Sequence, residues 1–243
     1  MKKPIAIVMN PKAGKGQVEK ICQTITNTLR KLDHPFEIFR ADWPVDFQSF
    51  GSVWIVGGDG TLNYLVNHAT GPLPPMVIFK GGTGNDFARH LYGEADTGEI
   101  IRIALGAAPR PVDAGICNGQ YFLNTIGVGF DGKVLRSMTT IRWLGSFLGY
   151  YTAIIKNIFS FREPLFRLEI SGMPVIQGRF LLVQVSNAPT TGGGFKVSPL
   201  ANIQDGQLNL LTCRPLSFLK RFFVLPAVRK GKHLSFPFVE HKL

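Results

Sequence analysis

The chain has 243 residues, of which 45% are hydrophobic and only 18% are charged. Disorder needs low hydrophobicity and high charge, so this composition excludes an unstructured chain, and the lack of a strict glycine period or heptad repeat excludes collagen-like and coiled-coil proteins. Lysine and arginine number 27 against 16 acidic residues, and the net charge of +11 favours an anionic partner such as phosphate, nucleic acid or an acidic membrane surface. The three cysteines lie far apart, which indicates reduced cytoplasmic thiols and not a disulfide framework.

The first 105 residues alternate short apolar runs with segments of helical spacing. The apolar runs predict strands at 5–9, 36–39, 53–56 and 76–79. The helical spacing predicts helices at 18–32, 61–69, 85–91 and 99–105. This alternation predicts a doubly wound α/β domain, which we assign to residues 1–110.

The alternation ends at the glycine- and proline-containing segment 106–111. Beyond it, strand-like stretches at 115–126, 165–171, 179–186 and 208–213 are interrupted by one helical stretch at about 133–159. We therefore expect residues 111–243 to form a mainly β, sandwich-like domain with a helical insertion. No apolar run is long enough for a secretory signal or a membrane span, so no transmembrane segment is expected.

Three glycine-containing loops follow predicted strands, which is where open α/β sheets bind ligands. The first, at 10–16, lacks the P-loop spacing, but its glycines, its lysines and the helix that follows suit a phosphate. The second, at 57–63, reads Gly-Gly-Asp-Gly-Thr-Leu-Asn, and the third, at 80–89, begins Lys-Gly-Gly-Thr-Gly-Asn-Asp. These glycines leave backbone N–H groups free to line an anion cradle, and Lys80 adds positive charge. Together the loops predict nucleotide binding.

Carboxylates accompany the glycine loops. Asp59 and Asp86 lie in the second and third loops, and Asp113 lies at the domain junction. A carboxylate beside phosphate is repelled unless it holds a metal ion or activates a hydroxyl, so this set predicts Mg²⁺ and phosphoryl transfer. For Asp59 a helix N-cap is the alternative.

One further motif, at 127–132, fits the dinucleotide fingerprint Gly-x-Gly-x-x-Gly. A long helical stretch follows where a second strand is needed, and no acidic residue lies about 20 positions further on to bind a ribose. A dehydrogenase is therefore not favoured.

Read together, the three loops resemble the diacylglycerol kinase catalytic-domain family, which contains bacterial lipid kinases and is related to sphingosine and ceramide kinases. The resemblance continues through the segments 112–113, 122–130, 192–195, 205–208 and 231–233. It implies an N-terminal nucleotide-binding α/β domain followed by a β-sandwich domain. The implied activity is transfer of the γ-phosphoryl group of ATP, with Mg²⁺, to a diacylglycerol-like or sphingoid lipid hydroxyl.

The resemblance also implies roles for individual residues. Asp59, Asp86 and Asp113 would form the catalytic network around Mg²⁺ and phosphate. A structural cation site would comprise Asn202, Asp205 and Gln207, where the residues alone favour an Asp-Gly turn. The residues that would bind the nucleotide are Asn10, Gly14, Gly57, Gly58, Asp59, Gly60, Thr61, Leu62, Asn63, Gly82, Thr83 and Asn85.

Family members normally continue past the Gly-Lys-His segment at 231–233 with further strands and a second Asp-Gly-Glu motif, whose acidic residues are implicated as the base. The sequence ends at Leu243, so this C-terminal part is expected to be lacking. Three interpretations are open: Asp59 is the base, the chain is a fragment, or it is a catalytically inactive nucleotide- or lipid-binding relative. A soluble-substrate enzyme like NAD kinase is another alternative, because NAD kinases share the Gly-Gly-Asp-Gly-Thr loop.

Two stretches combine aromatic and basic residues. The stretch 143–159 forms an apolar-aromatic helical surface flanked by basic residues, and 218–232 mixes phenylalanine with lysine and arginine. For the first, a helix packed on the β domain is the alternative. We expect a cytoplasmic protein in peripheral contact with an anionic membrane, binding ATP and a lipid substrate but no nucleic acid, with a homodimer left open.

Overall fold

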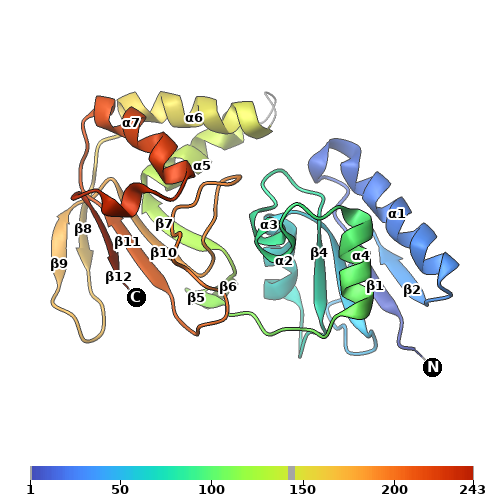
Figure 1. Cartoon of the computed structure of the whole chain (residues 1–243). Helices are drawn as coiled ribbons and strands as arrows, with labels where there is room; N and C mark the ends of the chain where they lie inside the picture. Colours follow the sequence, from blue (N-terminus) through green and yellow to red (C-terminus); the bar gives the residue numbers. More distant parts are fainter. Residues whose placement is uncertain (1, 142–145, 243) are drawn as a thin grey trace. The chain divides into compact units, whose positions relative to one another are not determined.

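The computed structural model describes residues 2–141 and 146–242 (Figure 1). The chain divides into two compact units, Met1–Leu123 and Asn124–Leu243. This division lies after the boundary expected at residues 110–111, because the segment 115–122 is joined to the first unit. The amide of Asn67 donates a 2.9 Å hydrogen bond to the Tyr121 carbonyl, and the Tyr121 N–H donates one of 2.7 Å to Asn67 Oδ1.

The first unit is built on a parallel four-stranded sheet of order β2-β1-β3-β4. The strands are β1 (Ile5–Met9), β2 (Phe36–Phe39), β3 (Ser52–Gly57) and β4 (Met76–Lys80). The helices are α1 (Gln17–Lys31), α2 (Asp59–His68), α3 (Asp86–Tyr92) and α4 (Thr97–Gly106), with a 3₁₀ turn at Gly14–Gly16 and a small hairpin of β5 (Gly115–Cys117) and β6 (Gln120–Phe122).

Both faces of this sheet are covered, which explains its continuous apolar strands. Ile5, Ile7 and Met9 of β1 share one core cluster with residues of α1 and α4. The alternate residues Ala6 and Val8 are also fully buried, and α2 packs on β3 (Figure 1). The doubly wound α/β domain predicted from the sequence is confirmed.

The strand expected at 115–126 is wrong in one respect, because the chain reverses direction within it. Asn118 and Gly119 have φ angles of 51° and 77°, the left-handed backbone that a two-residue hairpin requires. Their turn joins β5 to β6, and a separate strand then opens the second unit.

The second unit is an antiparallel sheet of order β12-β11-β10-β7 covered by helices. Its strands are β7 (Thr125–Gly129), β10 (Leu182–Ser186), β11 (Asn209–Cys213) and β12 (Val239–Lys242), with a separate hairpin of β8 (Leu165–Leu168) and β9 (Ile176–Arg179). Its helices are α5 (Phe130–Ile141), α6 (Ser146–Ser160) and α7 (Phe218–Arg229), with a 3₁₀ turn at His233–Ser235. One core cluster joins Val134 of α5 and Ile158 of α6 to Leu211 of β11, so these helices lie on the sheet (Figure 1).

The single helical stretch expected at 133–159 is two helices, α5 and α6. Trp143 and Leu144 of the predicted apolar-aromatic surface, and Arg142 that flanks it, lie outside the described residues. Helix α7 was not predicted, because Pro226 lies inside it. Within the described ranges, no helix is both long and apolar enough to cross a bilayer.

Two of the three glycines in the segment 127–132 have structural roles. A Cβ atom at Gly127 would collide with the carboxylate of Asp131, and Gly129 has a φ of 112°, which favours glycine. These two glycines are therefore explained without a dinucleotide, whereas a Cβ atom at Gly132 would meet nothing within 4 Å.

Candidate active site

The three glycine loops of the first unit lie against one another at the carboxyl ends of β1, β3 and β4. The Gly81 N–H donates a 2.9 Å hydrogen bond to the Gly57 carbonyl. A Cβ atom on Gly58 would lie 2.9 Å from the Cα of Gly82, and one on Gly14 would collide with the Gly81 carbonyl oxygen. Only glycine permits these approaches, so the loops form one surface lined by backbone.

Helix α2 begins inside the second loop and offers an anion site. Gly58 is its N-cap with extended backbone, and Asp59 is its first residue. The N–H groups of a helix's first turn have no carbonyl partner within the helix, and the helix dipole favours negative charge there. A Cβ atom on Gly60 would meet no atom within 4 Å, so space is open beside these donors. This arrangement suits a phosphate group.

The carboxylate of Asp59 faces the start of α3. Its two oxygens accept hydrogen bonds of 3.0 Å from the Asp86 N–H and 2.8 Å from the Phe87 N–H. The N-cap residues are Gly58 for α2 and Asn85 for α3, so Asp59 is the N-cap of neither helix, although its carboxylate binds the first two N–H groups of α3. These two bonds fix the position of the Asp59 carboxylate between the first turns of α2 and α3. Asp86 is itself buried beside it.

Two asparagines hold the loops in shape. Asn85, in left-handed backbone, accepts a 2.7 Å hydrogen bond from the Gly82 N–H through Oδ1 and donates one of 2.9 Å to the Gly82 carbonyl. Asn10 donates a 3.1 Å hydrogen bond to Thr61 Oγ1 and accepts one from the Lys12 N–H in the first loop. These side chains therefore position the loop backbone.

The remaining predicted residues of this unit are placed differently from one another. Leu62 is buried in the protein interior, whereas Asn63 and Thr83 are exposed. Asp113 lies in the extended segment between α4 and β5, outside the three loops. The Leu62 side chain therefore does not line the loop surface, and its N–H donates a 3.1 Å hydrogen bond to the Gly58 carbonyl.

Lys80 does not add its charge to the loops as expected. Its ammonium group donates hydrogen bonds of 2.6 Å to the Gly93 carbonyl and 2.8 Å to the Ala95 carbonyl. The cation therefore stabilises the C-terminal end of α3, where the helix dipole is negative.

A pocket of about 750 Å³ adjoins the first turn of α2 and was not found from the sequence. It lies between the first loop, the segment after β2 and the exposed side of α2, and Gly60 and Arg40 contribute to its lining. The rings of Tyr64 and His68 stack with centroids 3.8 Å apart, and Trp43 meets Tyr64 edge-on at 5.7 Å. In the part of the chain that the structure describes, the buried Trp43 Nε1–H has no acceptor. The sequence signal was the tryptophan after β2 and the aromatic residues four apart in α2.

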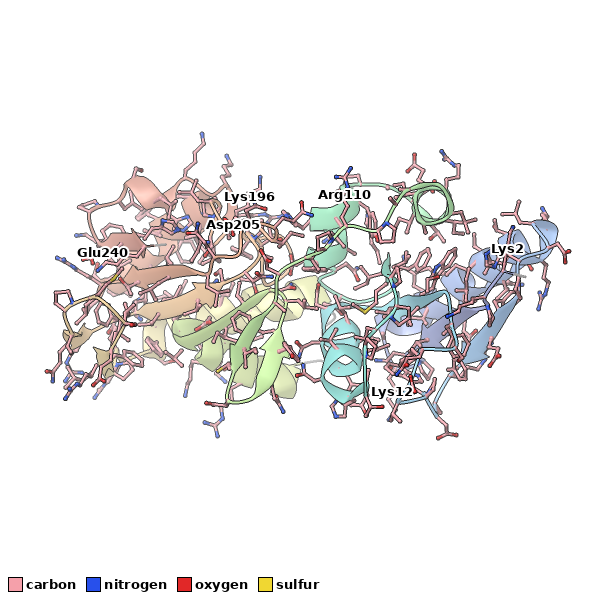
Figure 2. All side chains as sticks on the ribbon, turned by 90° about the horizontal axis from the view of Figure 1, so that it is seen from below. Lys2, Lys12, Arg110, Lys196, Asp205 and Glu240 are labelled. Carbon is pink, nitrogen blue, oxygen red and sulfur yellow. The ribbon has the colours of Figure 1, made fainter. Side chains whose placement is uncertain are left out.

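The predicted structural cation site lies in the loop of the second unit that precedes β11, where Figure 2 labels Asp205. Asn202 Oδ1 accepts a 3.1 Å hydrogen bond from the Gln204 N–H, and Asp205 Oδ1 accepts one of 3.0 Å from the Gln207 N–H. These are two successive side-chain-capped turns. Across residues 2–141 and 146–242, no three His, Cys, Asp or Glu side chains gather in a group able to hold a metal ion.

The second unit contains an apolar cavity of about 120 Å³ between its sheet and its helices. Burial shifts the pKa of three side chains in its lining. It raises the pKa of the Asp131 carboxyl and lowers the pKa of His233, whose Nε2 lies 2.9 Å from the Val197 carbonyl oxygen. Burial also raises the pKa of the Cys213 thiol to about 12. All three shifts favour the neutral form of the side chain within the cavity.

Comparison with known proteins assigns the two units to two domain families. Residues 4–117 match the diacylglycerol kinase catalytic domain, and residues 124–242 match the YegS C-terminal NAD kinase beta sandwich-like domain. The expected fold class, an α/β domain followed by a β-sandwich-like domain, is therefore confirmed.

Curated relatives include lipid kinases from several bacteria. The chain is 28% identical over 193 residues to a diacylglycerol kinase of Bacillus subtilis (strain 168), a match that covers 77% of this chain and 63% of the relative. It is 32% identical over 192 residues to a probable lipid kinase YegS-like of Chromohalobacter salexigens, covering 76% of this chain and 61% of the relative. The chain thus spans less than two thirds of the length of these two relatives.

Solved structures share the fold. A putative diacylglycerol kinase from Bacillus anthracis str. Sterne superposes with a TM-score of 0.78 at 22% identity, covering 99% of this chain and 82% of that chain. A second structure, of a diacylglycerol kinase from the same organism, gives a TM-score of 0.75 at 24% identity.

Proposed function

We propose that this chain, whose residues 4–117 match the diacylglycerol kinase catalytic domain, transfers the γ-phosphoryl group of ATP to a lipid hydroxyl. The observation that carries the proposal is the meeting of three glycine loops at the N-terminus of α2. Phosphoryl transfer depends on positioning and on charge stabilisation more than on covalent steps by the protein. A backbone-lined anion site with a carboxylate beside it suits that chemistry.

The nucleotide is proposed to lie across the start of α2. Its phosphates would accept hydrogen bonds from the N–H groups of Asp59 and Gly60, where the open space at Gly60 leaves room for them. Its nucleoside would enter the neighbouring pocket, whose volume of about 750 Å³ lies in the usual range for ligand sites. There the stacked Tyr64 and His68 rings offer an aromatic surface, and the unused Trp43 Nε1–H offers a donor.

Asp59 and Asp86 are the residues proposed to hold the Mg²⁺ that accompanies the nucleotide. Magnesium in phosphoryl-transfer sites is usually bound through one or two carboxylates together with substrate phosphates, so a protein cluster of three acids is not needed and this donor set fits. The ion would neutralise charge on the phosphates. The two α3 N–H groups that bind Asp59 fix the orientation of its carboxylate, and Asp113 is proposed as a further member of this network.

The second unit is proposed to receive the lipid. Its cavity of about 120 Å³ is smaller than the ~150 Å³ cavity known to hold benzene, so without rearrangement it accommodates only part of an acyl chain. Its mainly apolar lining supports a lipid acceptor over a soluble one. Peripheral contact with an anionic membrane would give the enzyme access to that lipid, and the cation site at Asn202, Asp205 and Gln207 stays a proposal.

An NAD-kinase-like activity is the second candidate, because the second unit matches a domain described as NAD kinase beta sandwich-like. A catalytically inactive relative that only binds nucleotide or lipid is the third. The three candidates differ in what accepts the phosphoryl group.

One assay separates these candidates. The chain is incubated with Mg²⁺, γ-labelled ATP and, separately, diacylglycerol, sphingosine, ceramide or NAD. We expect a labelled phospholipid, lost in Asp59→Asn and retained in the matched control Asp33→Asn, which changes an exposed acid of the same unit. Label on NAD would support the second candidate, and ATP binding without any transfer would support the third.

A further inference from the structure

The outer sides of α6 and α7 carry apolar side chains that the core of the second unit does not use. Along α7, Val224, Leu225 and Val228 pack toward the core, while the side chains one turn apart on the other side are exposed. Phe223 is 78% exposed, and Phe222 is 52% exposed. We call the following six exposed residues the aromatic patch: Ile155, Phe159, Phe218, Leu219, Phe222 and Phe223.

The aromatic patch is continuous across the two helices. The rings of Phe159 in α6 and Phe218 in α7 have centroids 5.8 Å apart. Within α7, Phe218 and Phe222 are four residues apart, as are Leu219 and Phe223, so each pair lies on one side of the helix. Scattered exposed apolar residues are ordinary, whereas a contiguous patch marks an interaction site.

The sequence segments that surround the aromatic patch are basic and contain no Asp or Glu. The ranges 132–162 and 206–239 hold no Asp or Glu, so all 16 acidic residues of the chain lie outside them. Three exposed cations lie within three residues of a patch residue in the sequence: Lys156, Arg162 and Lys220. Two more, Arg229 and Lys230, lie at the C-terminal end of α7. Any partner of this surface is therefore expected to be both apolar and anionic.

We propose that the aromatic patch docks the chain on the surface of an anionic lipid bilayer. A surface helix with phenylalanine and leucine on one side and lysine or arginine beside them lies in the bilayer interface, with the apolar side chains at the boundary of headgroups and acyl chains. The flanking cations would then face lipid phosphates, which attract them. This inference deepens the proposed function, on which it rests, by naming the surface through which the lipid substrate is reached.

A second copy of the chain is a poorer occupant on charge grounds. A two-fold interface through the aromatic patch would bring Lys156, Lys220 and Lys230 of one copy near the same residues of the other, and like charges across an interface oppose association. Nucleic acid would use the cations, but phosphate contacts leave the exposed phenylalanines without a role. An anionic bilayer gives a role both to the cations and to the exposed phenylalanines.

Vesicle co-sedimentation of the full chain tests the proposal, with vesicles of pure phosphatidylcholine and of phosphatidylcholine and phosphatidylglycerol in equal amounts. We expect stronger binding to the mixed vesicles. The Phe222→Ser, Phe223→Ser variant is expected to lower that binding by about tenfold or more, since buried apolar area sets much of interfacial affinity. Replacing Lys156, Lys220 and Lys230 by glutamine should lower binding by about fivefold per lysine and flatten its dependence on salt.

The control variants remove exposed apolar side chains or exposed lysines from other parts of the chain. Ile116→Ser with Leu165→Ser removes two side chains that are 63% and 61% exposed on the β5 and β8 strands, and Lys20→Gln with Lys31→Gln removes two exposed charges of α1. Both controls should bind mixed vesicles like the wild type. Equal binding by the phenylalanine variant, or no vesicle binding by the wild type, would overturn the proposal. Two other results would also overturn it. One is sedimentation velocity showing that the patch variants lose only a dimer, and the other is an oligonucleotide-binding assay showing that they lose only a nucleic-acid complex.

Failure of this inference is distinguishable from failure of the proposed function. Vesicle binding needs no catalysis, so binding that depends on the aromatic patch supports the inference even if no lipid is phosphorylated. If the kinase is active, the phenylalanine variant should lose activity toward diacylglycerol in mixed vesicles while keeping its activity toward a water-soluble short-chain diacylglycerol. Equal activity of variant and wild type on both forms would contradict docking through this surface.

Discussion

Replacing Gly58 by alanine tests whether the close contact of the glycine loops is needed for nucleotide binding. The new Cβ would lie 2.9 Å from the Gly82 Cα, whereas non-bonded carbons prefer about 3.5–4.0 Å, so the loops must separate by about 0.6–1.1 Å. The backbone of Gly58 has φ −116° and ψ −169°, which alanine adopts without strain, and the effect therefore comes from the contact alone. Overpacking of this kind costs about 1–3 kcal/mol of the free energy of unfolding.

The same displacement moves the phosphate donors of α2. Because a shift of about 1 Å at a site can cost on the order of 100-fold in activity, we expect the Kd for Mg-ATP, measured by calorimetry, to rise at least tenfold in Gly58→Ala. The control is Gly106→Ala at the C-terminal end of α4, where a Cβ meets nothing within 4 Å. Its Kd should be unchanged, and its free energy of unfolding should be unchanged or up to about 1 kcal/mol higher, because a helix favours alanine over glycine. Wild-type affinity and stability in Gly58→Ala would refute the reasoning.

Three further predictions concern the second unit and the cysteines. Burial raises the folded-state pKa of Asp131 above its ordinary 3.8, so the folded chain holds that proton more tightly, and the free energy of unfolding should fall as pH rises from 3.8 through the raised pKa. Asp131→Asn should lack this loss and unfold at higher urea concentration than wild type at neutral pH. Arg221→Met should cost about 3–5 kcal/mol in urea unfolding, because it leaves Glu163 buried without its 2.6 Å partner, and a loss below about 1 kcal/mol would contradict this. Cys213 should resist dithionitrobenzoate at pH 8 in the native chain, because its pKa is about 12 and little thiolate forms. The less buried Cys117 should react, and peptide mapping that finds Cys213 modified first would contradict this.

The first unit was the more predictable half of the fold because its strands are buried on both faces. Such strands appear as unbroken apolar runs, and the predicted strand at 5–9 coincides with β1, all of whose residues are buried. Helix α2 begins at Asp59, two residues before the predicted 61, because Gly58 and Gly60 read as loop in isolation. The helix forms there because the tertiary contacts of Asp59 with α3 stabilise its first turn.

The second unit was less predictable for two physical reasons. The turn at Asn118 and Gly119 divides the predicted strand at 115–126, and a second break follows between β6 and β7. Helix α7 is apolar on its outer side as well as its inner side, so the aromatic patch removes the polar face that usually reveals a surface helix. The same exposed apolar side chains therefore hide the helix in the sequence and form the proposed membrane surface.

The meeting of the three glycine loops could be predicted, because neighbouring parallel strands bring their carboxyl ends to one edge of a sheet. The contacts of individual side chains could not. Lys80 turns to the end of α3, and Trp43 joins the pocket beside α2, because both depend on how distant segments pack. The type of a residue does not reveal which distant segment its side chain will contact.

The most direct test of the central claim is a titration of the ¹⁵N-labelled chain with Mg-ADP, followed by backbone amide chemical shifts. If the nucleotide phosphates bind at the start of α2, the largest shifts should occur at Gly58, Asp59, Gly60 and Gly82. Saturable shifts confined to other residues, with these four amides unchanged, would contradict it.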